Sequence, residues 1–175
     1  MATRAIKPLL LASGLLIAPV VAWWAFGMTL NHSPSVATGI WYAAQTAPVA
    51  PRVGDVVRTC LDSSDQTAYR ERGYLRWGFQ CDGSEALLKP VAAVAGDRYA
   101  ITKAGIVLNG DLVPDTQPLR ADNAGRVLNW AGEGVLAADE VLLISQLPTS
   151  LDSRYFGPVS TDRVLATMKP LWTWH

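Results

Sequence analysis

The hydrophobic and polar positions divide the chain into one long apolar run and a series of short apolar segments. Residues 8–30 carry no charged side chain, and a helix that crosses a bilayer needs about 20 such residues. Beyond residue 30, short runs rich in Val, Ile, Leu and Tyr alternate with Gly, Pro and Asp, which is typical of strands and turns. The pattern predicts a transmembrane anchor within residues 1–30 and one mainly β domain over residues 31–175.

Seven segments have the apolar, β-branched composition that favours strands. They are residues 39–43, 54–60, 86–96, 98–102, 105–110, 140–145 and 163–168. Residues 98–110 predict a hairpin that turns at Lys103, Ala104 and Gly105. The polar, glycine-containing segment 62–85 predicts an excursion or a short helix.

The charges that flank the apolar run predict its orientation. Arg4 and Lys7 precede the run, and no charged residue follows it until Arg52. Basic residues are retained on the cytoplasmic side, so the N-terminus is expected there and residues 31–175 on the opposite side. A cleaved signal peptide is the alternative, but the apolar core exceeds the usual length and no clean Ala-x-Ala site follows it.

The composition narrows the class of protein further. Acidic and basic residues balance at 15 each, which gives no indication of nucleic-acid binding. Half of the residues are hydrophobic and seven are Trp, so we expect a packed core rather than disorder.

The two cysteines are Cys60 and Cys81. Outside the cytoplasm, such a pair predicts a disulfide that closes a loop of about twenty residues. A buried pair of free thiols is the alternative. Two cysteines without clustered histidines make a poor metal site, so neither a metal nor a cofactor is predicted.

The stretch NHSPSVATGIWY, residues 31–42, places Ser33 and Ser35 directly after the apolar run. A hydroxyl nucleophile needs a base, usually a histidine. His32 lies an odd number of positions from Ser35, so in an extended segment the two side chains face opposite ways. His175 is the last residue, where chains fray. A Ser-His-Asp triad is therefore disfavoured.

A neutral lysine is the other base that a serine can use, and the chain has four lysines. Lys7 lies on the cytoplasmic side, Lys103 lies in a predicted turn and Lys169 precedes a proline near the C-terminus. Lys89 alone lies within an apolar segment, and burial can lower a lysine pKa by about 3 to 5 units. Lys89 is therefore the candidate base; the alternative is an edge strand from which it points to solvent.

Four segments together resemble the type I signal peptidase family, which are membrane-anchored serine-lysine proteases. They are NHSPSVATGIWY (31–42), VGDVV (53–57), LLKPVAAVAGD (87–97) and SLDSRYFGPV (150–159). The order of the segments is most similar to the plasmid-transfer, TraF-type branch. The resemblance implies a signal-peptidase-like antiparallel β domain preceded by one transmembrane helix, in a single-pass protein of the bacterial inner membrane with a periplasmic catalytic domain.

Residue by residue, the resemblance implies a catalytic centre of three serines and one lysine. Ser35 matches the nucleophile and Lys89 its general base. Ser33 matches the hydroxyl that forms the oxyanion hole with the backbone N–H of Ser35, and residues two apart in an extended segment face the same way. Ser150 matches the hydroxyl that orients the lysine amine.

The resemblance also covers four residues around this centre. Asp152 matches an acid that the transfer-type branch is thought to need, while in general signal peptidases this Asp mainly pairs with the Arg that corresponds to Arg154. An extended segment would place Ser150, Asp152 and Arg154 on one face. Gly96 and Asp97 follow the lysine segment as they do in the family.

Three departures from the general enzymes favour a specialised function. Val36 and Ala37 follow the nucleophile where Met-Pro is usual, and Pro90 follows the lysine where the general enzymes carry Arg. LISQLPT, residues 143–149, lacks their Gly-Asp-Asn.

The predicted function is that of a protease that matures a pilin-like or exported precursor during conjugation, by hydrolysis or by joining the product's ends. Its expected partners are that precursor, the lipid bilayer and components of a conjugation or type IV secretion apparatus. A general signal peptidase and a non-catalytic anchored assembly module of a secretion channel are the alternatives.

Overall fold

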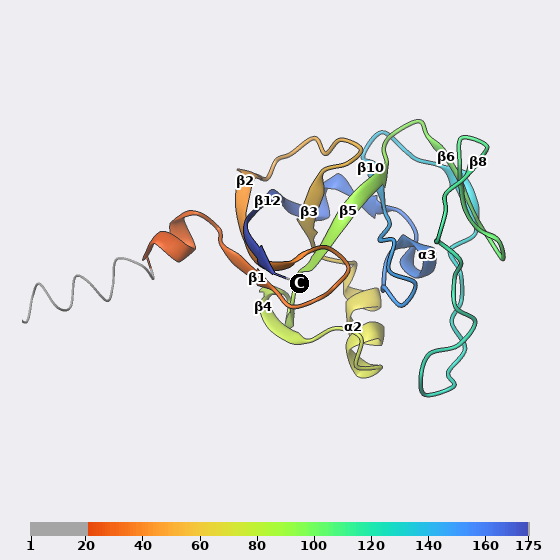
Figure 1. Cartoon of the computed structure of the whole chain (residues 1–175), viewed down its shortest axis with the longest axis horizontal. Coiled ribbons are helices and arrows are strands. Elements are labelled where there is room, and N and C mark those ends of the chain that lie inside the picture. The colour runs from red at the N-terminus through yellow and green to blue at the C-terminus, as the bar shows by residue number, and fades with distance from the viewer. Residues whose placement is uncertain (1–20, 175) are drawn as a thin grey trace, which may run out of the picture.

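The structure, a computed structural model, describes residues 21–174 (Figure 1). The strands are β1 (Thr29–Asn31), β2 (Thr38–Thr46), β3 (Val56–Thr59), β4 (Trp77–Cys81), β5 (Leu87–Ala93), β6 (Arg98–Thr102), β7 (Gly105–Leu108), β8 (Asp111–Leu112), β9 (Glu133–Val135), β10 (Glu140–Leu143), β11 (Val159–Ser160) and β12 (Val164–Trp174). The helices are α2 (Ser63–Glu71), α3 (Ser153–Phe156) and the 3-10 helix η1 (Thr161–Arg163). The fold is therefore mainly β, as the sequence predicts.

The apolar run at residues 8–30 lies largely outside the described residues. Within residues 21–174, no helix combines the length and the apolar character that a bilayer crossing requires. Residues 21–25 are helical, and the chain then enters β1.

A seven-stranded antiparallel sheet forms the body of the molecule, in the order β1-β2-β12-β3-β5-β10-β11. Strand β5 lies in its interior, between β3 and β10, and Lys89 is paired with Val57 of β3. Strand β12 pairs with β2 on one side and with β3 on the other, so strands from both ends of the described chain meet in the sheet. Strands β12 and β3 therefore lie between β2, which follows Ser35 in the chain, and β5, which carries Lys89.

A second, four-stranded sheet has the order β8-β7-β6-β9. Its centre is the predicted hairpin of β6 and β7, which turns between Thr102 and Gly105. The turn that leads into it contains Gly96 at φ 86°, a left-handed conformation that favours glycine, and nothing lies near its missing side chain. The Asp97 carboxylate accepts hydrogen bonds from Val94 N–H and the Asn109 side chain, and these two bonds lower its pKa.

Alternation along β10 connects the two sheets through the core. Val141 and Leu143 pack in a cluster with residues of β3 and β5 and with residues just before and after α2. Leu142 and Ile144, the residue after β10, pack in a second cluster with residues of β6 and β7. Successive side chains of a strand face opposite sides, so both faces of β10 are buried. A third cluster contains Trp41 of β2, Leu88 of β5, and Ala166 and Met168 of β12.

The junction between residues 21–25 and the sheet is packed against the sheet. Ala43 N–H donates to the Phe26 carbonyl at 3.2 Å, and the Arg58 guanidinium donates to Thr29 Oγ1 at 2.8 Å. A side chain at Gly27 would meet Ala43 Cβ at 2.9 Å. The folded body thus begins a few residues before residue 31.

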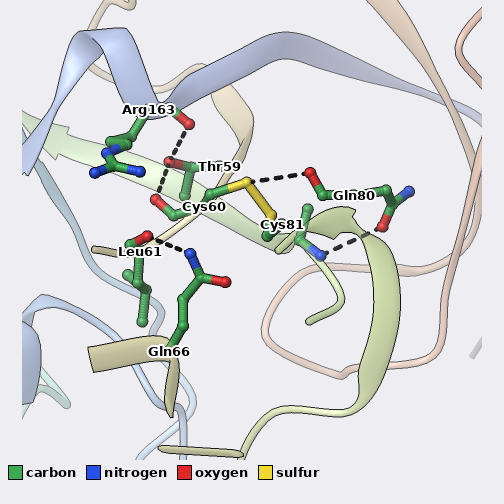
Figure 2. The surroundings of a disulfide bond; sticks show 8 residues. Thr59, Cys60, Leu61, Gln66, Gln80, Cys81 and Arg163 are labelled. Carbon is green, nitrogen blue, oxygen red and sulfur yellow. Dashed lines mark hydrogen bonds between the residues drawn. A yellow bond between two sulfur atoms is a disulfide. The ribbon is translucent and has the colours of Figure 1, made fainter. Parts of the chain in front are cut away.

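Cys60 and Cys81 form a disulfide that ties the end of β3 to the end of β4, with their Cα atoms 5.5 Å apart (Figure 2). The surrounding side chains hold backbone carbonyls: Thr59 Oγ1 donates to Arg163 O, and Gln66 Nε2 donates to Leu61 O. The polar segment 62–85 is consequently an excursion that contains α2 and β4 and is fixed at its base.

Candidate active site

A cleft of about 620 Å³ opens between the turn after β1, the start of β5 and the loop before α3. Ser33, Ser35, Lys89 and Ser150 all line it. Three distant segments of the sequence therefore contribute the hydroxyls and the amine that the sequence analysis singles out.

Lys89 forms the centre of the polar group in the cleft. Its Nζ lies 2.7 Å from Ser35 Oγ and 2.7 Å from Ser150 Oγ, and the two hydroxyls are 3.3 Å apart. The three side chains are nearly closed to solvent, with Ser35 8%, Lys89 3% and Ser150 2% exposed. A neutral amine in this position is close enough to accept a hydrogen bond from Ser35 Oγ while it donates one to Ser150 Oγ.

Burial lowers the pKa of Lys89 to about 8, because desolvation penalises the ammonium form. The Asp152 carboxylate opposes this effect and the Arg154 guanidinium adds to it. The alternative in which Lys89 points to solvent from an edge strand is wrong, because β5 is an interior strand and the side chain is buried.

The segment that carries Ser33 and Ser35 is a turn, although the sequence analysis expects an extended backbone. Asn31 organises this turn: its Nδ2 donates to the carbonyls of Ser33, Val36 and Ala37, and its Oδ1 accepts Ser33 N–H. The two hydroxyls still point the same way, with Ser33 Oγ 2.9 Å from Ser35 Oγ and 3.4 Å from Ser35 N. The turn brings the Ser33 hydroxyl beside both Ser35 Oγ and the Ser35 N–H, which donates to it.

Asp152 and Arg154 form a fully buried ion pair beside the cleft. Arg154 Nε donates to Asp152 Oδ1 at 2.8 Å and Nη2 donates to Oδ2 at 2.7 Å, with both side chains 0% exposed. The expected extended face with Ser150 is wrong, because the chain turns into α3 at Ser153 and Asp152 is its N-cap. Ser150 therefore faces Lys89, whereas Asp152 faces Arg154 and the backbone N–H of Ser145.

Two residues of this network, Asn31 and Ser145, are not among the predicted site residues. Asn31 has a detectable signal, because an asparagine in a run of turn-forming residues often bonds to nearby backbone groups. Ser145 has no such signal, because it closes a predicted strand and its hydroxyl reaches a residue 110 positions away. Its hydroxyl donates to the Ser35 carbonyl at 2.7 Å.

The chain matches the family described as "Signal peptidase, peptidase S26" over residues 2–173. It belongs to this family of peptidases, and the resemblance inferred from its motifs is confirmed.

Two relatives from plasmid and conjugal transfer systems are similar to this chain over most of its length. The chain is 34% identical to the plasmid transfer protein TraF of Escherichia coli, with 94% of this chain and 96% of that protein covered. It is 38% identical to the conjugal transfer protein TraF of Agrobacterium tumefaciens, with 85% and 84% covered. The structure also aligns with a signal peptidase I of Enterococcus faecalis at a TM-score of 0.40 and 14% identity, over 68% of this chain and 97% of that one.

Proposed function

We propose that this chain is a membrane-anchored serine-lysine endopeptidase that removes the signal sequence from a pilin-like or exported precursor during conjugative transfer. The observation that carries the proposal is the contact between the buried Lys89 amine and the Ser35 hydroxyl, at 2.7 Å. The names of the TraF relatives support the conjugative setting.

Acylation begins when neutral Lys89 takes the Ser35 proton and Ser35 Oγ attacks the scissile carbonyl carbon. The Ser33 hydroxyl and the Ser35 N–H stabilise the resulting oxyanion. When the intermediate collapses, the C–N bond breaks and the Lys89 ammonium returns its proton to the departing amine. Ser150 holds the lysine amine in line throughout.

Deacylation uses the same groups with a new nucleophile. Lys89 takes a proton from water as the water oxygen attacks the ester carbonyl carbon; when this intermediate collapses, the C–O bond to Ser35 breaks and Lys89 returns the proton to Ser35 Oγ. If the N-terminal amine of the acylated segment, which is the part before the scissile bond, attacks the ester carbonyl instead of water, Ser35 leaves and that segment is joined end to end. The joined segment is lighter by one water than the same segment released by hydrolysis.

The edge of β5 supports binding of an extended substrate. Strand β10 pairs with β5 only from Pro90 onward, where Ile144 N–H donates to the Pro90 carbonyl. Backbone groups alternate in direction along a strand, so those of Leu88 point to the same side as those of Pro90, but into the cleft. An extended segment of the precursor can add there as a strand, with its scissile bond beside Ser35.

The predicted anchor supports the position of the site. The folded body begins near Phe26, whose carbonyl accepts the Ala43 N–H, so the membrane-spanning part of the apolar run ends before it. Ser35 then lies about ten residues beyond that part, within about 33 to 36 Å of extended chain from the bilayer. With the N-terminus cytoplasmic and residues 31–175 periplasmic, a precursor held in the same membrane presents its cleavage site at that height.

The proposal is tested with the full chain purified in detergent and a transfer-pilin precursor carrying Ala at its cleavage site. Wild type and the control Ser160→Ala, whose serine lies on β11 away from the cleft, are expected to cleave it. Ser35→Ala and Lys89→Ala are expected not to, and the product mass distinguishes hydrolysis from joining. Equal cleavage by Ser35→Ala would refute the proposal.

Two further observations address the alternatives. Rescue of a strain depleted of its own signal peptidase would favour a general signal peptidase. Full conjugation with both Ser35 and Lys89 replaced would favour a non-catalytic assembly module.

A further inference from the structure

Ser145 lies two residues beyond the end of β10 and is 1% exposed. Its hydroxyl accepts a hydrogen bond from Leu147 N–H at 3.1 Å and donates one to the Ser35 carbonyl at 2.7 Å. A serine hydroxyl has a single proton. That proton is therefore committed to the main chain of the proposed nucleophile.

The backbone of Ser145 is held by the buried ion pair. Its N–H donates to Asp152 Oδ2 at 3.1 Å, and its carbonyl accepts from Arg154 Nη2 at 3.2 Å. The same Nη2 donates to the Leu147 carbonyl at 2.7 Å. Asp152 and Arg154 together grip the segment from which the Ser145 hydroxyl projects.

The Ser35 carbonyl is distinct from its neighbours in the turn. The Asn31 side chain holds the carbonyls of Ser33, Val36 and Ala37, all from within the same segment. The Ser35 carbonyl instead takes its hydrogen bond from Ser145, 110 positions away in the sequence. That bond fixes the peptide plane next to the proposed nucleophile against the body of the protein.

We infer that Ser145 is a positioning residue for Ser35, and that it transmits the effect of the buried Asp152–Arg154 pair to the nucleophile's backbone. The inference rests on the proposed serine-lysine function and deepens it. It connects Asp152 to the nucleophile through Ser145, from a position where the Asp152 hydrogen bonds go to Arg154 and Ser145. Ser145 itself lies outside the set of residues that line the cleft, so it acts through Ser35 and not on the substrate.

The test compares Ser145→Ala with a matched variant, Thr116→Val. The Thr116 hydroxyl is also buried, accepts Ile106 N–H and donates to the Val113 carbonyl, but it serves the β6–β7 hairpin. Both variants lose one accepted and one donated hydrogen bond, so similar losses of thermal stability are expected. Only Ser145→Ala is expected to lower kcat, by about 10- to 100-fold, since a small displacement of a reacting group has that effect.

Two further readouts separate positioning from general loosening. KM and the pH midpoint of the reaction are expected to be unchanged in Ser145→Ala, because the cleft and the surroundings of Lys89 remain. Ser145→Thr, which keeps the hydroxyl, is expected to recover much of the kcat that Ser145→Val loses. This pair carries the test if Ser145→Ala does not fold.

The assay uses an internally quenched peptide with Ala-x-Ala before the scissile bond. Wild-type kcat in Ser145→Ala, or equal kcat in Ser145→Thr and Ser145→Val, would overturn the inference and leave the proposed function standing. Cleavage by Ser35→Ala at the wild-type rate would instead remove the proposed function. The two failures are therefore distinguishable.

Discussion

Lys89 Nζ lies 2.7 Å from Ser35 Oγ, although the two residues are 54 positions apart in the chain. Strands β2, β12, β3 and β5 are neighbours in one sheet, which places the two residues within reach of each other. The Lys89 amine is buried and therefore poorly solvated. One contact thus combines the two requirements of a serine-lysine pair, which are reach and a depressed pKa.

The rate of cleavage is expected to rise with pH through about 8. Burial lowers the pKa of Lys89 to about 8, so the neutral base is the minority form below that pH and the major form above it. A plot of log kcat/KM is expected to climb with a slope of about one and then level off. Cleavage of a pilin precursor between about pH 6 and 10 checks this, and a midpoint near the ordinary lysine value would contradict it.

Replacement of Lys89 is expected to change how stability depends on pH. The folded-state pKa of about 8 lies below the usual 10.5, so the unfolded chain binds the proton more tightly. The charged lysine therefore destabilises the fold below about pH 8, and this penalty fades as the pH rises toward 10.5. Relative to Lys89→Met, wild type is expected to gain about 2 to 3 kcal/mol of unfolding free energy between pH 7 and 10. Urea titrations of both proteins at several pH values measure the difference, and parallel pH profiles would count against a depressed pKa.

Loss of the Ser33 hydroxyl is expected to slow the chemical step. Ser33→Ala removes one donor from the proposed oxyanion hole, which typically lowers kcat by about 10²- to 10³-fold. KM is expected to change little, because the bond forms mainly in the transition state. Ser33→Thr keeps a hydroxyl at the same site and is the control. An unchanged kcat in Ser33→Ala would assign the oxyanion to other donors.

The buried and the exposed ion pair are expected to differ sharply in their effect on stability. Asp152→Asn leaves the Arg154 charge buried without its counter-ion, which costs about 3 to 5 kcal/mol. Asp62→Asn breaks the pair with Arg163, in which the Asp62 side chain is 71% exposed. That change is expected to cost at most about 1 kcal/mol. Urea unfolding measures the loss of unfolding free energy in each variant. Equal losses would contradict the prediction that breaking the buried Asp152–Arg154 pair costs more than breaking an exposed one.

The strands could be predicted where the residues have an intrinsic preference. All seven predicted segments contain a strand, because their β-branched and apolar residues suit a pleated, buried surface. The short strands β1, β8, β9 and β11 have no such pattern and depend on their partners. Strand β12 runs beyond the predicted end at residue 168 through Pro170, where its register with β2 shifts and β3 no longer pairs with it. A proline is tolerated there because its missing N–H faces no partner strand.

The candidate site could be predicted only as far as its motifs reach. Ser33, Ser35, Lys89 and Ser150 are recognisable from their segments, and the structure brings them to one cleft. The turn around Ser35 and the capped helix at Asp152 differ from the extended backbones expected. Ser145 was missed because its significance lies in contacts with Ser35, Asp152 and Arg154 that no local pattern encodes.

The place of β12 within the large sheet sets an order of events during synthesis. This strand occupies an interior position between β2 and β3, yet it is the last strand of the described chain to be made. Until residues 164–174 have been made, the hairpin of β1 and β2, which flanks Ser35, has no strand that pairs it with β3 and β5. Strand β5 carries Lys89. We therefore expect Ser35 and Lys89 to come into contact only after β12 has joined the sheet, so a chain whose residues 164–174 have not yet been added lacks the contact between Ser35 Oγ and Lys89 Nζ.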